Sequence, residues 1–244
     1  MSYRQFKPHP ALSAYIDAYW LVEGSGNALH TSNILPDGCV DLIFNLDDQC
    51  RNTEGTITME SEKTYLIGTM TTFKTSCIGP DNKLIGVRFK PAAFSSFFRF
   101  APLHEITDLS IDFKPTDIPE INKLRERPVQ YLNHYFLNRL IQPRHNLLDV
   151  AREIEQAKGQ LPIHELAKRN YITTRQLERH FQRYVGTSPK EFANIIRFRN
   201  AHALIKRNKE KRSLLTIAFE CGYYDHAHLT NDIKRYTGLT PSQL

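Results

Sequence analysis

One segment of the chain occurs twice, 52 residues apart, and this repeat limits the fold more than any other feature. Residues 177–189 read LERHFQRYVGTSP, and residues 229–241 read LTNDIKRYTGLTP. In each copy two apolar residues four positions apart, Leu177 and Phe181 in the first, mark one buried face of a helix. A glycine then ends the helix, and Ser/Thr-Pro begins the next one. The repeat therefore predicts two similar helical units in the C-terminal part of the chain.

A second short helix precedes each copy and completes a helix-turn-helix pattern. These helices are expected at 163–169 and at 214–220. A turn of three or four residues follows each of them, and Thr173 or Asp225 then stands where a helix N-cap is expected. Gly222 lies in the second turn, at a position that needs a left-handed backbone. The sequence thus predicts two helix-turn-helix units.

The segment that joins the two units is itself predicted to be one long helix, over residues 189–207. Its apolar residues follow an amphipathic period: Phe192, Ile195, Ile196, Ala203, Leu204 and Ile205. About 19 residues at 1.5 Å each give a length of about 28 Å. Since one turn of DNA is ~34 Å long, this helix would hold two recognition helices against successive segments of the major groove.

Charge is distributed unevenly along the chain. Residues 151–244 hold 17 Lys and Arg against 9 Asp and Glu, a net charge of +8, whereas residues 1–150 hold 15 against 17, a net charge of −2. A basic C-terminal part favours a polyanionic partner. The alternative is an all-α repeat that binds nothing, and two polar recognition faces on a basic domain argue against it. We predict a sequence-specific regulator of transcription that binds double-stranded DNA.

The C-terminal part, over residues 147–244, resembles the AraC/XylS family of transcription regulators. The residues that carry the resemblance are Leu166-Ala167, Leu177, Phe181, Arg183, Gly186 and Ser188-Pro189, then Arg197, Ala201 and Leu204, and finally Ile217-Ala218, Gly222-Tyr223, Leu229, Ile233-Lys234, Gly238 and Thr240-Pro241. The resemblance implies an all-α domain with two helix-turn-helix units. It also implies RNA polymerase as a candidate partner, as for an activator, although the sequence does not distinguish activator from repressor.

Exposed polar positions of the first recognition helix are the main candidates for reading bases. Arg175 and Arg179 lie four positions apart on one face, and arginine can bind the O6 and N7 atoms of guanine through two hydrogen bonds. The resemblance places the family's base-reading positions on Arg175, Glu178 and Arg179. Glu178 would either accept a hydrogen bond from cytosine N4 or orient an arginine.

The second recognition helix offers a weaker set of candidates for base reading, namely His226, Thr230 and Asn231. The family often has arginine where this chain has Asn231, so fewer or weaker base contacts are expected there. This unit would then mainly hold the phosphate backbone. The candidate phosphate contacts of the whole domain are Thr174, Arg183, Lys190, Arg197 and Lys234, which would position the protein without specifying a sequence.

The first ~118 residues are predicted to be rich in β-structure, which makes the fold class α+β with two domains. Runs of β-branched and aromatic residues between turn residues give strand candidates at 39–46, 55–59, 65–70, 75–78 and 84–89. Short helices are expected at 10–19 and from residue 91 onward. Short strands separated by turns favour a small barrel or sandwich.

Three N-terminal segments, 35–44, 65–68 and 86–94, resemble an uncharacterised sensor domain that is often fused to AraC-type DNA-binding domains. This resemblance implies a cupin-like β-barrel that responds to a small-molecule effector of unknown identity. Asp37, Asp41 and Arg88 are the candidates for lining the effector pocket. Asp37 also fits as a simple turn residue between Pro36 and Gly38.

A small-molecule enzyme of the cupin type with a helical tail is the alternative from another class. Cupin-type metal chemistry needs two or three histidines and a carboxylate in one cluster, whereas His9, His30 and His104 are scattered. The four cysteines form no CxxC pair, and His226 and His228 point apart on a helix. We therefore expect no catalytic site, no metal and no cofactor. A sequence-neutral DNA packaging protein is a second alternative, and it predicts equal affinity for all duplexes.

The expected organisation is a sensor domain at 1–118, a helical connector and linker at 119–146, and a DNA-binding domain at 147–244. Pro128 divides the connector into two helices, and their apolar faces suggest a homodimer as a candidate assembly. No segment approaches the ~20 apolar residues of a membrane span, and the N-terminus lacks the apolar run of a signal peptide. We expect a cytoplasmic protein with no membrane partner.

Overall fold

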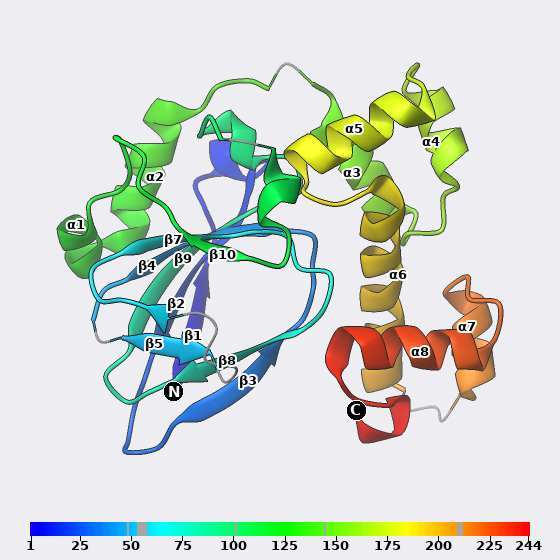
Figure 1. Ribbon diagram of the computed structural model, residues 1–244, viewed down its shortest axis with the longest axis horizontal. Helices are drawn as coiled ribbons and strands as arrows, with labels where there is room; N and C mark the ends of the chain where they lie inside the picture. The colour runs from blue at the N-terminus through cyan, green and yellow to red at the C-terminus, as the bar shows by residue number, and fades with distance from the viewer. Residues whose placement is uncertain (48, 53–57, 101, 144, 209–211) are drawn as a thin grey trace.

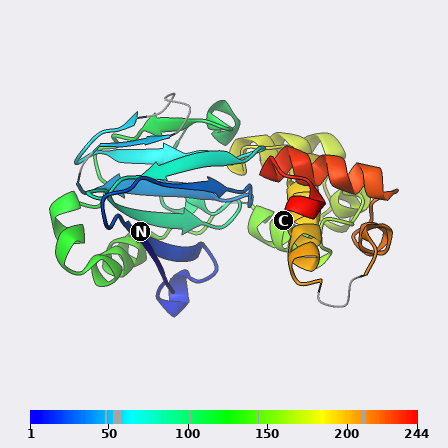
Figure 2. The ribbon, with the colours of Figure 1, turned by 90° about the horizontal axis from the view of Figure 1, so that it is seen from below.

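The computed structural model describes residues 1–47, 49–52, 58–100, 102–143, 145–208 and 212–244. It places a β-rich N-terminal domain beside a helical C-terminal domain (Figure 1). Seen from below, the two domains lie side by side, and one end of the β-structure faces the helices (Figure 2). The predicted α+β organisation, with a β-rich domain followed by an all-α domain, is confirmed.

The larger sheet has six strands, and all of its neighbouring pairs are antiparallel. Along the sheet the order is β1 (Ser2–Phe6), β2 (Ile16–Glu23), β9 (Lys83–Phe89), β4 (Val40–Asn45), β7 (Thr64–Ile67) and β10 (Ser110–Asp112). Successive side chains of a strand point to opposite faces. In β4, Leu42 and Phe44 therefore enter the main core, whereas Asp41 and Ile43 point to the other face.

The smaller sheet lies over this second face. Its strands, in order, are β3 (His30–Ile34), β8 (Lys74–Ile78), β5 (Cys50–Asn52) and β6 (Thr58–Met59). Trp20 and Ile43 of the larger sheet and Ile78 of the smaller one share a small apolar cluster. The described strands form two separate sheets, so of the small barrel or sandwich expected from the strand pattern the structure has an open sandwich and no closed barrel.

Two helices cover the core-facing side of the larger sheet. They are α1 (Ile121–Glu126) and α2 (Pro128–Arg139), and they bury Leu124, Leu132 and Phe136 completely. The proline at the start of α2 separates the two helices, as predicted. The residues that they bury pack in the chain's own core, and the expected pairing of two chains through their apolar faces stays a prediction.

The C-terminal domain consists of α3 (Leu147–Gln156), α4 (Ile163–Arg169), α5 (Thr174–Tyr184), α6 (Pro189–Lys206), α7 (Leu214–Glu220), α8 (His226–Thr237) and the 3-10 helix η4 (Pro241–Gln243). It has two apolar cores, one for each half of the repeat. The long helix α6 contributes to both, with Phe192 in the first core and Phe198 in the second. The expected linker, 142–146, joins α2 to α3, and its residue 144 lies outside the described residues.

Two expected helices of the N-terminal domain are wrong. The segment 10–19 forms only a 3-10 turn, η1 (Pro10–Leu12), after which β2 begins and pairs with β1 and β9. The segment after residue 91 forms only the 3-10 turn η2 (Phe94–Ser96), and a further turn, η3 (Leu103–Ile106), follows it. Pairing with distant strands outweighed the local helical signals in the first case. Of the strand expected at 55–59, residues 55–57 lie outside the described residues and the rest is β6.

Candidate DNA-binding surface and ligand pocket

Each helix-turn-helix unit is a pair of helices, α4 with α5 and α7 with α8, and neighbouring residues fix where each second helix begins. The Thr173 hydroxyl accepts a hydrogen bond from the Gln176 amide, and the Gln176 side chain accepts one from the Thr173 amide. The Asp225 carboxylate accepts a hydrogen bond from the His228 amide at 2.7 Å. Such caps satisfy N–H groups that have no partner inside a helix. Both recognition helices therefore start as the local sequence dictates.

The helices α5 and α8 lie on the same side of α6, near its two ends (Figures 1 and 2). With 18 residues, α6 is about 27 Å long. Its buried phenylalanines belong to the cores of the first and the second unit, so one stiff helix joins the two. Its length is of the order of one DNA turn, ~34 Å.

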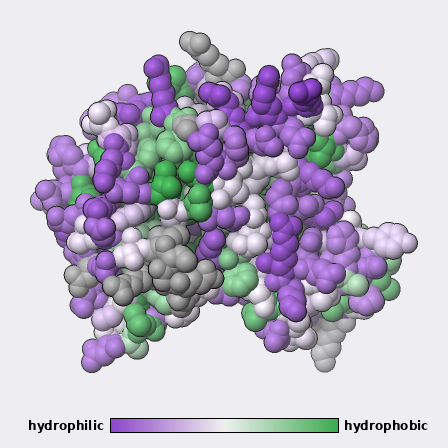
Figure 3. Space-filling view, viewed as in Figure 1, coloured by the Kyte–Doolittle hydropathy of each residue, from purple (hydrophilic) through white to green (hydrophobic). Residues whose placement is uncertain are grey.

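The first recognition helix presents its predicted base-reading residues to solvent. Arg175, Glu178 and Arg179 are exposed, whereas Leu177 and Phe181 are fully buried. The face of the C-terminal domain that Figure 3 displays is predominantly hydrophilic. The helix is thus divided into an apolar side that packs and a polar side that is free to meet a polar partner.

The second recognition helix has a similar division with a less basic exposed side. His226 and Asn231 are exposed, and Leu229 and Ile233 are buried. The Thr230 hydroxyl donates a hydrogen bond to the backbone carbonyl of His226 at 2.7 Å, so it is already engaged within its own helix.

Four of the five predicted phosphate contacts are exposed, and the fifth has a different environment. Thr174, Arg183, Lys190 and Lys234 are open to solvent. The Arg197 guanidinium instead lies 4.6 Å from the centre of the Tyr223 ring and 3.8 Å from a carboxylate oxygen of Asp232. Its side chain, only 17% exposed, therefore joins α6 to the second helix-turn-helix unit.

A cavity of about 760 Å³ lies between the two sheets of the N-terminal domain. Apolar side chains form much of its wall, among them Val22, Ile43 and Ile78. The helix α6 completes the lining with Phe198 and His202, so the cavity reaches the boundary between the two domains. Cavities of this size suit drug-sized molecules.

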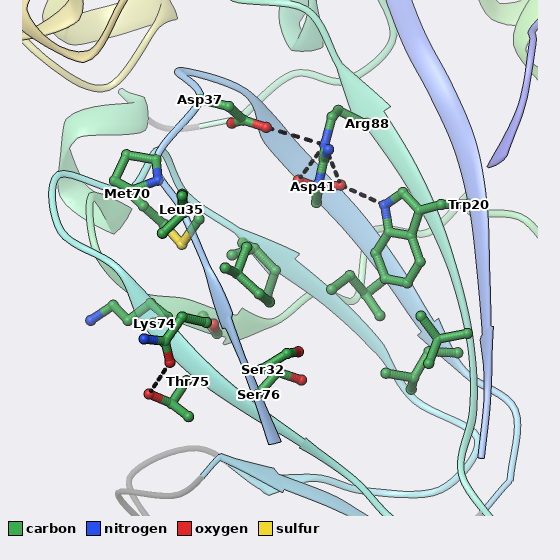
Figure 4. A pocket seen from close by; sticks show the side chains of 18 of the residues that line it. Trp20, Ser32, Leu35, Asp37, Asp41, Met70, Lys74, Thr75, Ser76 and Arg88 are labelled. Atoms are coloured by element: carbon green, nitrogen blue, oxygen red, sulfur yellow. Dashed lines mark hydrogen bonds and ion pairs between the residues drawn. The ribbon is translucent and has the colours of Figure 1, made fainter. Parts of the chain in front are cut away.

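The three predicted pocket residues, Asp37, Asp41 and Arg88, come together at one side of this cavity (Figure 4). Asp41 and Arg88 are direct partners across β4 and β9, and Arg88 Nε lies 3.3 Å from the Asp41 carboxylate and 3.4 Å from that of Asp37. The Trp20 indole N–H donates a hydrogen bond to Asp41 at 2.7 Å. Burial raises the pKa of Asp41, although Arg88 acts in the opposite direction. Two carboxylates therefore share one guanidinium.

Sequence reasoning missed three residues of this pocket: Trp20, Arg199 and His202. Trp20 follows directly after the segment 10–19 that was expected to be a helix, and the alternation of Trp20 and Val22 along one face of a strand is the signal that would have found it. Arg199 and His202 belong to the other domain, and no sequence signal indicates that contact. Arg199 Nη1 donates a hydrogen bond to the Asp37 carbonyl at 3.5 Å, which connects the charged cluster to α6.

In the described part of the chain, no group of three or more His, Cys, Asp or Glu side chains is arranged to hold a metal ion. None of its helices has both the length and the apolar character needed to cross a lipid bilayer. The four cysteines are free thiols.

Fold and site together define a protein with a double helix-turn-helix domain and a β-rich domain that encloses a pocket. Family models give the same division. Residues 166–244 match a family described as "Helix-turn-helix domain", and residues 4–112 match a "Domain of unknown function (DUF6597)". The C-terminal domain is therefore an AraC-type helix-turn-helix domain, as the sequence predicted.

Curated relatives match about a third of the chain. An uncharacterized HTH-type transcriptional regulator of Haemophilus influenzae is 33% identical over 90 residues, which is 37% of this chain and 30% of the relative. The HTH-type transcriptional activator RhaS of Escherichia fergusonii is 28% identical over 79 residues, or 32% of this chain and 28% of RhaS. The chain spans less than a third of the length of the curated relatives it matches.

Two solved structures match the chain over different shares of its length. Apo ToxT from Vibrio cholerae is 10% identical with a TM-score of 0.49, over 93% of this chain and 95% of ToxT. A probable AraC family transcriptional regulator from Rhodopseudomonas palustris is 27% identical with a TM-score of 0.35, over 39% of this chain and 93% of that chain.

Proposed function

We propose that this chain is a sequence-specific DNA-binding regulator of transcription, that it acts in the cytoplasm, and that it is not an enzyme. The observation that carries the proposal is the pair of recognition helices, α5 and α8, which lie on one side of α6 with their polar residues exposed. The names of the relatives, all HTH-type regulators and one of them an activator, support it. A regulator of this kind would have double-stranded DNA as its partner and RNA polymerase as a further one.

In this proposal α5 enters the major groove and reads bases. Arg175 and Arg179 bind guanine edges, each contact being worth ~1–3 kcal/mol of discrimination, and Glu178 accepts from cytosine or orients an arginine. Lys190 and other exposed cations contact phosphates and fix the register. The second helix, α8, reads fewer bases because its exposed side offers His226 and Asn231 rather than arginine.

Binding of the full chain to labelled duplexes at physiological salt tests the proposal. The DNA upstream of its own gene should bind ~10³-fold more tightly than a random duplex. Arg179→Ala should relax base preference at one half-site, whereas Lys190→Ala, the matched control on an exposed cation, should weaken all sequences alike and reduce the salt slope by about one. Equal affinity of the unmodified chain for all duplexes would instead favour the packaging protein.

We further propose that a small-molecule effector binds in the cavity between the sheets. The apolar wall suits an apolar body, and the cluster of Asp37, Asp41 and Arg88 suits a polar head. Because two carboxylates share one guanidinium there, a head that is cationic or donates hydrogen bonds fits best. Of the other cations that line the cavity, Arg199 donates to the backbone carbonyl of Asp37 rather than to either carboxylate, and Lys74 directs its ammonium away from the cluster (Figure 4).

Thermal unfolding of the full chain with paired probes tests the chemistry of the effector. Arylalkylamines should raise the unfolding temperature, and carboxylic acids of the same shape should not. Asp41→Asn should abolish the effect of the amines, since it removes the carboxyl group with which the amine would pair at the head group. Stabilisation by the acids alone would show that the head-group assignment is wrong.

The domain boundaries at 118 and 146 and the homodimer remain proposals as well. The burial of α1 and α2 in the N-terminal core supports placing the connector with the sensor domain, which leaves the segment 140–146 as the junction. Limited proteolysis should then cut first at this junction. Light scattering of the full chain decides between monomer and dimer.

A further inference from the structure

The N-terminal domain contacts the C-terminal ends of both recognition helices, at equivalent positions of the repeat. With the offset of 52, position 185 corresponds to 237 and position 186 to 238. At both ends a backbone carbonyl accepts a hydrogen bond from a side chain of the N-terminal domain, and a glycine with positive φ follows. The last carbonyls of a helix have no partner within it. The N-terminal domain supplies a hydrogen-bond donor to such a carbonyl at the end of each recognition helix.

At the end of α5 the contacts are two short hydrogen bonds. The hydroxyl of Thr69 donates to the carbonyl of Val185, and the hydroxyl of Thr107 donates to the carbonyl of Gly186, each at 2.5 Å. Thr69 is fully buried. Gly186 has a φ of +100°, and a Cβ on it would lie 3.3 Å from the Leu103 carbonyl oxygen. The N-terminal domain thus packs directly against the backbone of this helix end.

At the end of α8 the contacts are one hydrogen bond and one aromatic ring. The side-chain amide of Asn33 donates to the carbonyl of Thr237 at 3.3 Å. Gly238 has a φ of +76°, and a Cβ on it would lie 2.8 Å from the Phe73 ring. The ring therefore occupies space that only glycine leaves open.

One short segment connects the two helix ends. It comprises residues 69–73, after β7, with Thr69 at α5 and Phe73 at α8, and we call it the bridging segment. Its centre is anchored by Asp108, whose carboxylate accepts hydrogen bonds from the Thr71 amide at 2.7 Å and from its hydroxyl at 2.5 Å. Met70 and Asp108 also line the cavity between the sheets. The bridging segment is thus both a wall of the cavity and a support for each recognition helix.

We infer that the bridging segment fixes the two recognition helices relative to each other and transmits occupancy of the cavity to both at once. A molecule against Met70 displaces the segment, and both helix ends then move together. Two helices held in advance at the spacing of the DNA bind without the cost of ordering them. The DNA-binding step of this inference rests on the proposed function, whereas the coupling of the two helix ends does not.

Hydrogen exchange of the full chain, measured by mass spectrometry, tests the coupling without DNA or ligand. Phe73→Ala alters the contact with α8, yet it should speed exchange about fivefold at residues 184–188, the end of α5, as well as at 236–240. Thr69→Val should give the reciprocal result, and Thr69→Ser, which keeps the hydroxyl, should behave like the unmodified chain. Asp108→Asn, at the cavity wall, should affect both ends.

The matched control is Leu29→Ala, which removes an apolar side chain of the same domain that is 71% exposed. It should leave both helix ends unchanged. Faster exchange confined to the helix end nearest each substitution would overturn the coupling.

DNA affinity completes the test. Phe73→Ala should bind the preferred duplex about tenfold more weakly, and it should lose less affinity than the unmodified chain when one base pair is inserted between the half-sites. Unchanged affinity and spacing preference would overturn the role of the bridging segment in DNA binding. Coupled exchange in a chain that binds no DNA would overturn the proposed regulator and leave the coupling intact.

Discussion

Replacing Arg197 by alanine tests whether this side chain holds the second helix-turn-helix unit in place or contacts DNA. Its guanidinium packs over Tyr223, just before α8, and pairs with Asp232 within α8. The side chains of Arg197 and Asp232 are only 17% and 16% exposed. The substitution therefore removes a link between α6 and α8 and leaves a half-buried carboxylate without its cation. We expect Arg197→Ala to destabilise the C-terminal domain.

The size of the effect follows from the two contacts. A largely desolvated cation–π contact is worth about 2 kcal/mol. Removal of one partner of a fully buried ion pair costs ~3–5 kcal/mol, but at 3.8 Å and with some exposure this pair should contribute about 1–2 kcal/mol. The sum is about 3 kcal/mol, which for a chain of this size lowers the unfolding temperature by roughly 6–12 °C.

Urea unfolding of the full chain measures this loss. Asp232→Asn in the Arg197→Ala background should recover about 1 kcal/mol, because it removes the stranded charge. Lys190→Ala, on the exposed side of the same helix, should leave stability unchanged and reduce the salt slope of DNA binding by about one. If Arg197→Ala behaved like Lys190→Ala in both measurements, Arg197 would be a phosphate contact and the structural argument would fail.

Three further outcomes are expected. Burial raises the pKa of Asp41 above its ordinary value, so the folded chain holds a proton that the unfolded chain has released, and stability should fall as pH rises above about 4. Asp41→Asn should flatten this fall, which urea titrations from pH 4 upward would measure. Burial lowers the pKa of His145, so the neutral imidazole stabilises the folded chain fully above about pH 6.5. This contribution should decline as the pH falls towards the lower pKa of the folded chain, and His145→Gln should reduce the decline. Phe136→Ala, which empties a fully buried site in the N-terminal core, should cost ~3–5 kcal/mol in thermal unfolding.

Local signals predicted most of the C-terminal domain. Thr173 and Asp225 cap helices through amides within three residues of them, and Gly222 adopts the left-handed backbone expected in its turn. These interactions depend on neighbours in the chain, so a sequence is enough to find them. Both copies of the repeat carry these signals, so the second unit could be predicted as well as the first.

The N-terminal sheet was harder to predict because its stability comes from distant partners. Tyr19 of β2 pairs with Val87 of β9, and β1 is a largely exposed strand without an apolar alternation. The segment at 10–19 carried a helical signal, but β2 buries five consecutive side chains between two neighbouring strands. The strand pattern left a small barrel or a sandwich open, and only the pairing of the strands determined that two sheets form.

The amino-acid sequence by itself determined the two helix-turn-helix units, their caps and the polar sides of their recognition helices, because each depends on residues a few positions apart. Tertiary structure alone decided that Asp41 and Arg88 face each other in a cavity that α6 helps to line, and that the Thr69 hydroxyl meets a carbonyl 116 residues away. The first contact depends on strand register and the second on how two domains pack. Neither contact produces a periodic pattern in the sequence, because the partners are far apart in the chain and share no local geometry.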